Sequence, residues 1–431
     1  MTCGLVGRAD PSAADESAAP EWWSLHGQLT NVTQFQPSFH SPYQGSNSLD
    51  PGTHVDETVD ATLFAGLRLW KGGEIFVNPE LDQGFGLSDT LGVAGFPSGE
   101  AYKVGSNAPY VRLPRAFFRQ VIDLGGAEEE VADGPNQLAQ TQRADRITLT
   151  AGKFAAVDLF DTNRYAHDPH ADFLNWAVID SGAFDYAADA WGYSYGMAVE
   201  WKQSFWSVRG GAFDMSEVPN GKKLDYGFSQ VAYMLELEER HELWGRAGIA
   251  KLLGWLNSAH MASYADAVRL GEETGATPNV ALVRKRQTRA GLALNVEQEI
   301  APSLGAFLRL STNDGRKEAF EFTDVNRSAS AGLSVSGAAW SRPDDAFGLA
   351  AVLNGLSGDA RDYIAAGGLG ILIGDGRLPH YGAETILETY YSLRLLKWLG
   401  LALDYQYIQN PAYNRDRGPV SVIGLRVHAE M

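Results

Sequence analysis

Apolar and polar residues alternate one by one along many stretches of this chain. In residues 59–70, Leu63 falls with other apolar residues on one face of the expected strand, and Asp60 and Arg68 fall on the other. A period of two residues is typical of a β-strand that has one apolar face and one wet face. Residues 398–409 repeat the pattern, with tyrosines at one end of the apolar face. We therefore expect strands with one lipid-like face.

Applied to the whole chain, this pattern predicts sixteen strands. Most are about 10–14 residues long, whereas soluble strands average about 5–6 residues and a tilted strand crosses a membrane in about 9–11. They are expected near residues 24–36, 56–70, 74–82, 112–124, 144–154, 191–202, 205–214, 225–238, 241–254, 285–299, 302–313, 322–340, 344–355, 380–395, 397–409 and 418–430. Their length and even number indicate an all-β fold, a transmembrane antiparallel β-barrel of about 16 strands.

Short connections alternate with long polar loops between these strands. A membrane barrel has this order, with tight turns at one rim and functional loops at the other. Short turns are expected at Lys71-Gly72-Gly73, Lys202-Gln203-Ser204, Glu238-Glu239-Arg240, Ile300-Ala301-Pro302, Ser341 to Ala346 and Leu396-Lys397, and long loops near residues 36–56, 83–111, 155–190, 215–224, 255–284, 313–321, 356–379 and 410–418. The connection 125–143 is longer than this order predicts.

Composition agrees with a barrel without singling it out. Of 431 residues, 45% are hydrophobic, and no apolar run approaches the roughly 20 residues of a membrane-spanning helix. The formal net charge of −18 argues against nucleic acid as a partner, because such binding needs a basic face. One cysteine, Cys3, excludes an internal disulfide framework. Residues 1–21 lack the apolar run of a secretory signal, and we expect a flexible N-terminal leader there, before a single barrel domain at 22–431.

A set of arginines shares the polar face of the expected strands. The set predicts a water-filled interior in which neighbouring carboxylates, such as Asp60, Glu200 and Asp404, pair with many of the guanidinium groups. A lumen of mixed sign, rather than an anion filter, follows from that pairing. The arginines expected to face inward are Arg68, Arg115, Arg119, Arg209, Arg246, Arg289, Arg309 and Arg426.

The segment from Leu113 to Gln120 combines charge and an aromatic ring. Arg115 and Arg119 fall on one strand face with Phe117 between them. Guanidinium groups donate to vicinal hydroxyls, and an aromatic ring stacks on the C–H face of a sugar. In the alternative interpretation, Phe117 packs the wall and the arginines pair with loop acids. Strict alternation places Arg112 on the face opposite Arg115, at the loop edge rather than in the lumen.

The loop within residues 153–191 is the densest aromatic and carboxamide cluster in the chain. It is too long for a hairpin turn, and its seven aromatic residues from Phe154 to Tyr186 argue against disorder. Folded inward, it would narrow a pore and line it with Asn, Asp, Arg and Trp side chains. Residues 171–182 could supply a short helix.

Enzyme chemistry finds little support in the sequence. His167 with Asp168, and His170 with Asp172, have only superficial metal spacing, and loop pairs of this kind are usually structural. No nucleophile elbow, zinc-protease motif or phosphate loop occurs. We expect no catalytic residues, no metal site and no cofactor, although a Ser–His pair formed from distant strands stays open.

Long motifs at both ends and in the middle of the chain resemble the carbohydrate-selective outer-membrane porins of the OprB type. The resemblance runs from about residue 22 to the end. One departure is the final Ala429-Glu430-Met431, where such barrels usually end on an aromatic residue. The motifs are His26-Gly27-Gln28, Ser41-Pro42-Tyr43, Lys153 to Trp176, Gly182-Ala183-Phe184-Asp185-Tyr186, Asn410 to Val420 and Leu425-Arg426-Val427-His428-Ala429-Glu430.

The resemblance implies a sixteen-stranded barrel in the outer membrane of a Gram-negative bacterium. Loops at about 83–111 and 155–190 would form a narrow constriction that admits sugars by passive diffusion, with glucose-like monosaccharides the usual substrates. Carried over by motif, the constriction residues are Arg112, Arg115, Arg119, Asp158, Arg164, Asn175, Trp176 and Asp180, with Phe117 offering an apolar face beside Trp176.

Two other functions remain compatible with the sequence. One is a general size-selective porin for small solutes and ions, in which the arginines set only charge preference. The other is a soluble all-β sugar-binding protein, although its strands would then expose apolar faces to water. For the porin, outer-membrane lipid and small sugars are the expected partners, and association of barrels into homo-oligomers stays open.

Overall fold

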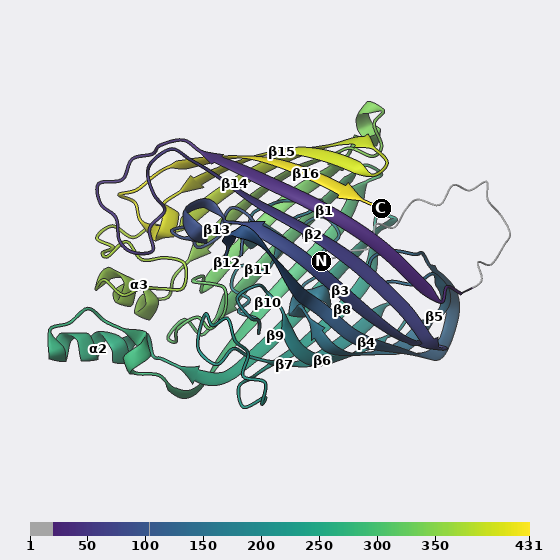
Figure 1. Ribbon diagram of the computed structural model, residues 1–431, viewed down its shortest axis with the longest axis horizontal. Helices are drawn as coiled ribbons and strands as arrows, with labels where there is room; N and C mark the ends of the chain where they lie inside the picture. The colour runs from purple at the N-terminus through teal and green to yellow at the C-terminus, as the bar shows by residue number, and fades with distance from the viewer. Residues whose placement is uncertain (1–19, 103) are drawn as a thin grey trace.

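A computed structural model describes residues 20–102 and 104–431. Sixteen antiparallel strands close into one barrel, in which each strand pairs with its neighbours in the chain and β1 pairs with β16 (Figure 1). The strands are β1 Trp23–Gln36, β2 His54–Trp70, β3 Gly73–Gly84, β4 Ser106–Val131, β5 Gln140–Phe154, β6 Ser194–Lys202, β7 Trp206–Asp214, β8 Val231–Leu243, β9 Arg246–Met261, β10 Lys285–Ala301, β11 Leu304–Asn313, β12 Arg327–Ser336, β13 Ala346–Gly355, β14 Glu384–Leu396, β15 Leu399–Gln409 and β16 Val420–Glu430. The predicted barrel and its strand number are confirmed.

Alternation along each strand sorts side chains between the lumen and the outer surface. In β15, Leu403 and Tyr405 are exposed on the outside, while Asp404 and Gln406 are buried inside. Aromatic residues gather on the outer surface near the short turns, where Trp201 packs on Trp206. Such rings suit the boundary between lipid and water. The described residues contain no helix with the length and apolar character needed to cross a membrane.

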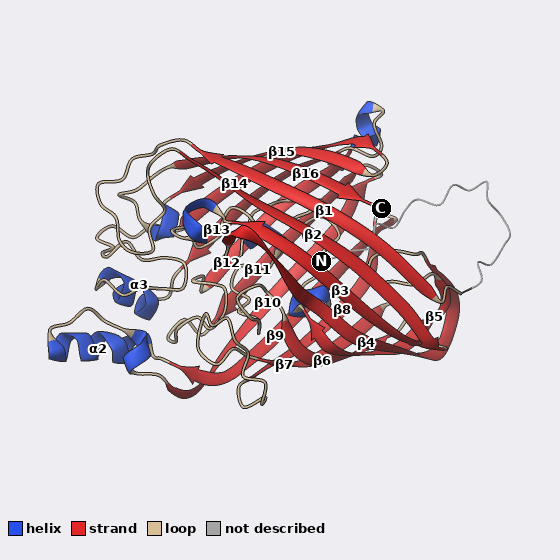
Figure 2. Ribbon diagram, viewed as in Figure 1, coloured by secondary structure: helices blue, strands red, loops and turns tan. Residues whose placement is uncertain are grey.

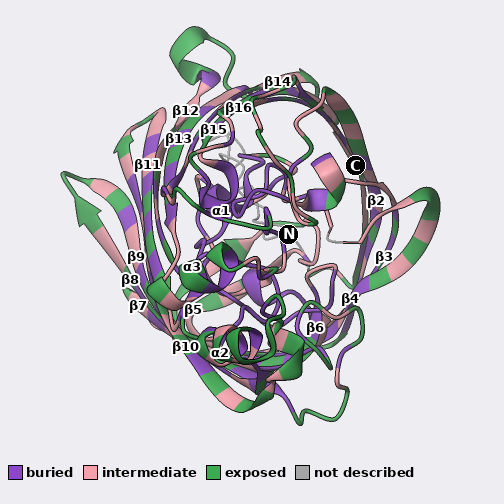
Figure 3. Cartoon of the chain, turned by 90° about the vertical axis from the view of Figure 1, so that its left-hand side faces the viewer, coloured by how far each residue is buried: buried purple, intermediate pink, exposed green. Residues whose placement is uncertain are grey.

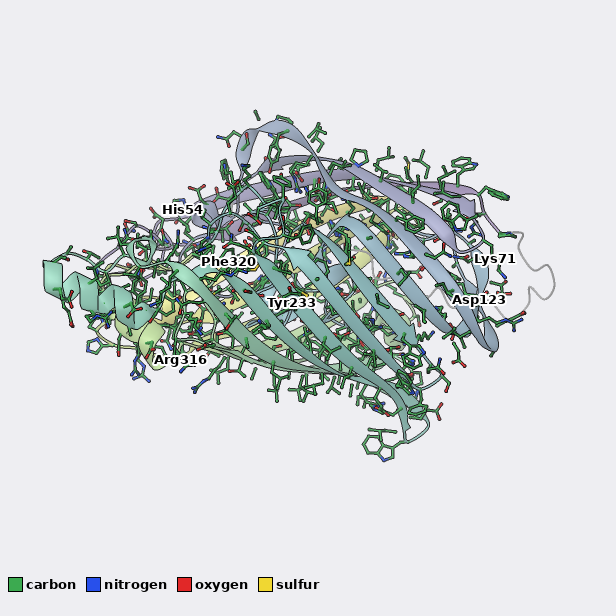
Figure 4. All side chains as sticks on the ribbon, turned by 90° about the horizontal axis from the view of Figure 1, so that it is seen from below. His54, Lys71, Asp123, Tyr233, Arg316 and Phe320 are labelled. Atoms are coloured by element: carbon green, nitrogen blue, oxygen red, sulfur yellow. The ribbon has the colours of Figure 1, made fainter. Side chains whose placement is uncertain are left out.

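Loops of different length mark the two ends of the barrel. At the long-loop end lie α2 Tyr264–Thr274 and α3 Gly358–Ala365, which pack together through Tyr264 and Tyr363 (Figure 2). At the short-turn end, Lys71 lies close to Asp123, far from His54 at the start of β2 and from Arg316 of a long loop (Figure 4). The described 3₁₀ turns are η1 Leu87–Thr90, η2 Ala156–Asp158, η3 Val280–Leu282, η4 Gly337–Trp340 and η5 Pro411–Tyr413.

One predicted turn is wrong. Residues Glu238-Glu239-Arg240 continue β8, and the chain reverses at Trp244 and Gly245. Both residues have positive φ, 54° and 72°, as a two-residue hairpin turn of the primed type requires. Tryptophan is an unusual residue in that position, so turn composition did not reveal it.

The long connection at 125–143 is an extension of the β4–β5 hairpin. The strands continue to Val131 and from Gln140, and the tip between them folds back against the barrel. Leu138 is fully buried there, and Arg119 donates to the carbonyl of Asn136 at 2.9 Å. At the short-turn end, the tip of the β4–β5 hairpin therefore contacts Arg119, whose side chain faces the lumen.

Inward loops fill the barrel and make its core. Seen from the long-loop end, buried chain occupies the lumen around α1, Trp176–Ile179 (Figure 3). This helix lies inside the predicted 171–182 window. Residues 319–326 are also buried in the lumen, whereas the sequence pattern assigned most of them to a strand near 322–340. That segment packs inside the barrel and is not part of its wall, because β12 begins only at Arg327.

Candidate functional site

Arginines of the barrel wall hold the inward loop of residues 155–193 by its backbone. Arg309 of β11 donates to the carbonyls of Val178 at 2.6 Å and Ala166 at 2.8 Å. Arg426 of β16 donates to three carbonyls between residues 169 and 172, at 2.6–2.8 Å. Both arginines face inward, as predicted, but their donors are used by the loop. They are therefore anchors of the loop rather than free charges of a pore.

Carboxylates of the same side of the barrel accept from loop N–H groups. Glu388 of β14 accepts from Leu174 and Asn175, at 2.5 and 3.2 Å. Glu297 accepts from the Arg164 backbone and Glu236 from the Asp161 backbone, at 2.7 and 2.8 Å. We call this side, strands β8, β10, β11, β14 and β16, the anchoring wall. Arg289 of β10 completes it through a fully buried ion pair with Asp185.

Asn175 belongs to this scaffold. Its side chain caps α1 by accepting from the Ala177 N–H at 3.0 Å, and its amide donates to the Gly95 carbonyl at 2.9 Å and to Gln406 at 3.0 Å. It is fully buried. The predicted constriction residue therefore joins two inward loops to the wall and offers no free group to a solute.

A cavity of about 90 Å³ lies on the other side of the loop. Strands β2, β3 and β4, which we call the passage wall, contribute Asp60, Thr62, Glu80 and Arg115 to its lining. Loop residues complete it, among them Phe96, Glu100, Tyr102, His170, Trp176, Asp180, Tyr186, Trp191, Tyr193 and Phe322. Its size admits several water molecules. The opening that the constriction leaves is therefore between the loop and the passage wall.

Arg115 and Asp158 form a two-pronged ion pair beside this cavity. The guanidinium donates to both carboxylate oxygens, at 2.8 and 2.7 Å, and lies 4.9 Å from the ring centre of Tyr193. Burial alone would raise the pKa of Asp158, but the Arg115 charge outweighs it and the pKa falls below the usual value. The pair is charged and internally neutralised, so it can hydrogen-bond a solute without attracting free ions strongly.

Arg112 lies in the lumen, contrary to the expectation from strict alternation. In the β3–β4 pairing, Asn78 faces Arg115 but Glu80 faces Arg112, so β4 carries one extra residue in a bulge at Leu113-Pro114. A bulge turns the following side chain to the other face. Arg112 pairs with Glu80 at 2.5 Å and its guanidinium lies 4.8 Å from the ring centre of Tyr102.

Trp176 and Asp180 bring unused polar atoms to the cavity lining. Trp176 stacks on Phe96, with ring centres 5.4 Å apart and planes 17° from parallel. Among the described residues, Nε1 of Trp176 and Oδ1 of Asp180 make no hydrogen bond of good geometry, although the Tyr186 side chain lies close to both residues and Nδ1 of His167 is 3.7 Å from Oδ1. Burial, reinforced by the nearby Asp161 carboxylate, raises the pKa of Asp180 to about 8. A neutral acid and an indole N–H thus meet an aromatic surface.

The remaining predicted constriction residues lie elsewhere. Phe117 packs in the wall against Phe76 and Phe154, as the alternative interpretation held. Arg119 lines a separate, smaller cavity with Glu200 and Arg209. Arg164 is exposed beside Tyr165.

Three predicted lumen arginines are paired with carboxylates near the short-turn end. Arg68 pairs with Glu74 at 3.1 Å and Arg246 with Glu299 at 2.9 Å. Arg209 lies between three glutamates, two of them at 2.7 Å. The prediction of a mixed-sign interior with paired charges agrees with this geometry.

Sequence reasoning missed much of the cavity lining. Tyr193 falls within the strand expected at 191–202, and Trp191 falls at the boundary between that strand and the aromatic loop, whereas β6 begins only at Ser194. Tyr102 and Glu100 lie in the loop expected at 83–111, where no motif in the sequence distinguishes them from their neighbours. The aromatic density on both sides of residue 190 was a signal that could have extended the loop to 193.

Comparison with known proteins gives one family and a consistent fold. The family described as carbohydrate-selective porin, OprB family, matches residues 46–431. A high-pH structure of Pseudomonas putida OprB is 17% identical, with 95% of this chain and 94% of that one covered and a TM-score of 0.69. The outer membrane channel DcaP of Acinetobacter baumannii is 10% identical, with coverage of 97% and 99% and a TM-score of 0.50. No curated protein matches.

Proposed function

The chain belongs to the OprB family of carbohydrate-selective porins, and on that premise we propose that it carries glucose-like monosaccharides by passive diffusion past Arg115, Trp176 and Asp180. As a porin it is an outer-membrane channel of Gram-negative type rather than an enzyme. The short turns then face the periplasm and the long loops face outward.

The observation that carries the proposal is the mixed chemistry of the cavity lining. A pyranose presents hydroxyls around its edge and C–H groups on its faces. Trp176, which stacks on both Phe96 and Phe322, supplies aromatic lining, while its Nε1 and the carboxyl group of Asp180 supply a donor and an acceptor. Arg115, with Tyr193 beneath its guanidinium, adds a charged donor that already has a counter-ion.

We expect the sugar to bind weakly, because the arginines near the cavity are already paired with carboxylates. A channel must hold its solute tightly enough to admit it and loosely enough to release it. A millimolar affinity corresponds to about −4 kcal/mol, which a few hydrogen bonds exchanged with water can supply. Since Arg112 and Arg115 are neutralised by Asp82, Glu80 and Asp158, the cavity offers no strong site for a free ion.

Single-channel conductance in a planar bilayer tests the proposal. The refolded protein is titrated with glucose and, separately, with an uncharged non-sugar solute of similar size. Saturable block of the ion current by glucose alone is the expected result. Equal, non-saturating effects of both solutes would contradict the proposal and indicate a general size-selective porin.

A further inference from the structure

Three side chains from distant parts of the chain meet at the edge of the cavity. Nε2 of His170 lies 3.2 Å from a carboxylate oxygen of Glu100 and 3.4 Å from one of Asp60. One potential ligand atom from each residue lies within 4.8 Å of the other two. His170 comes from the inward loop, Glu100 from the loop after β3, and Asp60 from β2. Sequence spacing could not have grouped them.

Negative charge is in excess at this point. Asp168 is a third carboxylate, and it accepts from Nδ1 of His170 at 2.8 Å. Within the described residues, no lysine or arginine comes within 4.0 Å of the carboxylates of Asp60, Glu100 or Asp168. Asp60 accepts from the Gln28 amide and shares a hydrogen bond with Glu100, which requires one proton between the two carboxyl groups. With a protonated His170, about one negative charge of the group then remains uncompensated. Asp60 and Glu100 are about 95% buried, so this excess is costly unless a cation joins the group.

The hydrogen bond from Nδ1 of His170 to Asp168 orients the imidazole ring. It holds a proton on Nδ1 and aims Nε2 at Asp60 and Glu100. Without a metal ion, Nε2–H donates to these carboxylates, and a bound cation would replace that proton. Histidines that bind metal ions usually donate their other ring N–H to a carboxylate or a carbonyl, which orients the ring and makes the ligand nitrogen more basic. Asp168 occupies that position.

We propose that Asp60, Glu100 and His170 form a binding site for a divalent transition-metal cation, with Zn²⁺ the favoured ion. Two carboxylate oxygens and one imidazole nitrogen make a ligand set that suits Zn²⁺ better than Ca²⁺, which prefers oxygen ligands alone. All three residues line the cavity, so the cation has a route of entry and keeps coordination positions for water.

Such a cation would connect the two inward loops to the passage wall. The anchoring wall holds the inward loop through many hydrogen bonds, whereas on the passage side the main attachments are the Arg115 pair and this cluster. Bound metal would add a cross-link at the mouth of the cavity. The inference does not depend on which solute the channel carries.

Titration calorimetry tests the site. The untagged, refolded full-length protein is first treated with a chelator to remove bound metal and is then titrated with Zn²⁺. We expect one ion per chain with a Kd of about 1 µM or tighter. His170→Gln and Glu100→Gln should each weaken binding at least about 100-fold, and Asp168→Asn about 10- to 100-fold. X-ray absorption of the bound zinc should show nitrogen and oxygen ligands at about 2.0–2.2 Å.

His380→Gln is the matched control, because His380 also pairs with an aspartate, Asp416, at 2.8 Å but lies exposed among the outer loops. It should bind Zn²⁺ like the wild type. Far-UV circular dichroism verifies that each variant keeps the barrel. Absence of saturable binding, wild-type affinity in both His170→Gln and Glu100→Gln, or loss of the site in His380→Gln would each overturn the proposal.

Discussion

The anchoring wall and the passage wall both present arginines and carboxylates to the lumen, but these side chains have different partners on the two walls. On the anchoring wall, Arg309 and Arg426 donate to loop carbonyls, and Glu388 accepts from loop N–H groups. On the passage wall, Arg112 and Arg115 pair with carboxylate side chains, and Arg115 lines the cavity. Backbone partners fix the course of a loop over many residues, whereas a side-chain pair such as Arg115 with Asp158 attaches it at one point and leaves surface for a solute.

This difference explains why the loop narrows the barrel without closing it. Backbone groups buried in a lumen must find partners, because each unpaired group costs about 1–3 kcal/mol. The anchoring wall supplies those partners in register with residues 161–180. The passage wall supplies none to the same segment through Arg112 or Arg115, so the loop stands away from it and the cavity remains.

Removing one anchor should give the largest effect. Arg309→Met keeps the length of the side chain but leaves the carbonyls of Val178 and Ala166 without donors and deprives Asp161 of its nearby cation. Breaking a buried charge pair costs about 3–5 kcal/mol. We expect the free energy of unfolding in urea to fall by that amount, single-channel conductance to rise several-fold, and glucose block to disappear.

Arg246→Met provides the comparison. Arg246 also faces the lumen, but it is about one-third exposed and pairs only with Glu299 near the short-turn end. Losing such a pair costs about 0–1 kcal/mol, so conductance and sugar block should stay near wild type. Equal effects of the two variants would mean that the anchoring wall has no special role.

Much of the fold could be predicted because a barrel wall repeats one local rule. Each strand needs only alternating faces, and that alternation is visible in residues 59–70 and again in β15. The rule fails where local sequence does not determine the conformation. Trp244 is not a residue typical of a turn, and residues 322–326 are buried in the lumen although the pattern placed them in a strand.

The site could be predicted only in outline, because its contacts join residues far apart in the chain. The aromatic loop and the inward arginines were visible in sequence, but which partner each arginine finds depends on how the loop lies in the lumen. Arg426 and Arg115 look alike in sequence, yet one holds carbonyls and the other Asp158. A single bulge at Pro114 was enough to reverse the face expected for Arg112.

On the passage side, Trp176 should have the next largest effect. Trp176→Ala removes both the aromatic face and the indole N–H from the cavity, so we expect the glucose concentration for half-maximal block to rise about tenfold, equivalent to about 1.4 kcal/mol. Ion conductance should stay similar or increase. Trp176→Phe keeps an aromatic face without the N–H, and an intermediate value would separate the two contributions.

Trp398→Ala is the control for the tryptophan series. Trp398 is half exposed on the outer surface and does not line the cavity. Its loss should leave glucose block unchanged. If Trp176→Ala also leaves the half-maximal concentration unchanged, Trp176 does not belong to the sugar site.

The smallest effect on glucose block should come from the proton on Asp180. Its pKa is raised from 3.8 to about 8, so the folded protein keeps a proton that the unfolded chain releases above about pH 4. The unfolded state then binds fewer protons, and the free energy of unfolding should fall as pH rises from about 4 to 8, then level off. Asp180→Asn should remove this part of the pH dependence, because its amide stays neutral.

Loss of the Asp180 proton should also change glucose block, because Asp180 lines the cavity. Above pH 8 the Asp180 carboxylate accepts a charge-assisted hydrogen bond from a sugar hydroxyl, which is stronger than the bond to a neutral acid. We expect the glucose concentration for half-maximal block to fall a few-fold between pH 7 and pH 9 in the wild type. In Asp180→Asn it should stay constant. A matching change in that variant would assign the pH response to another group and leave Asp180 a structural residue of the loop.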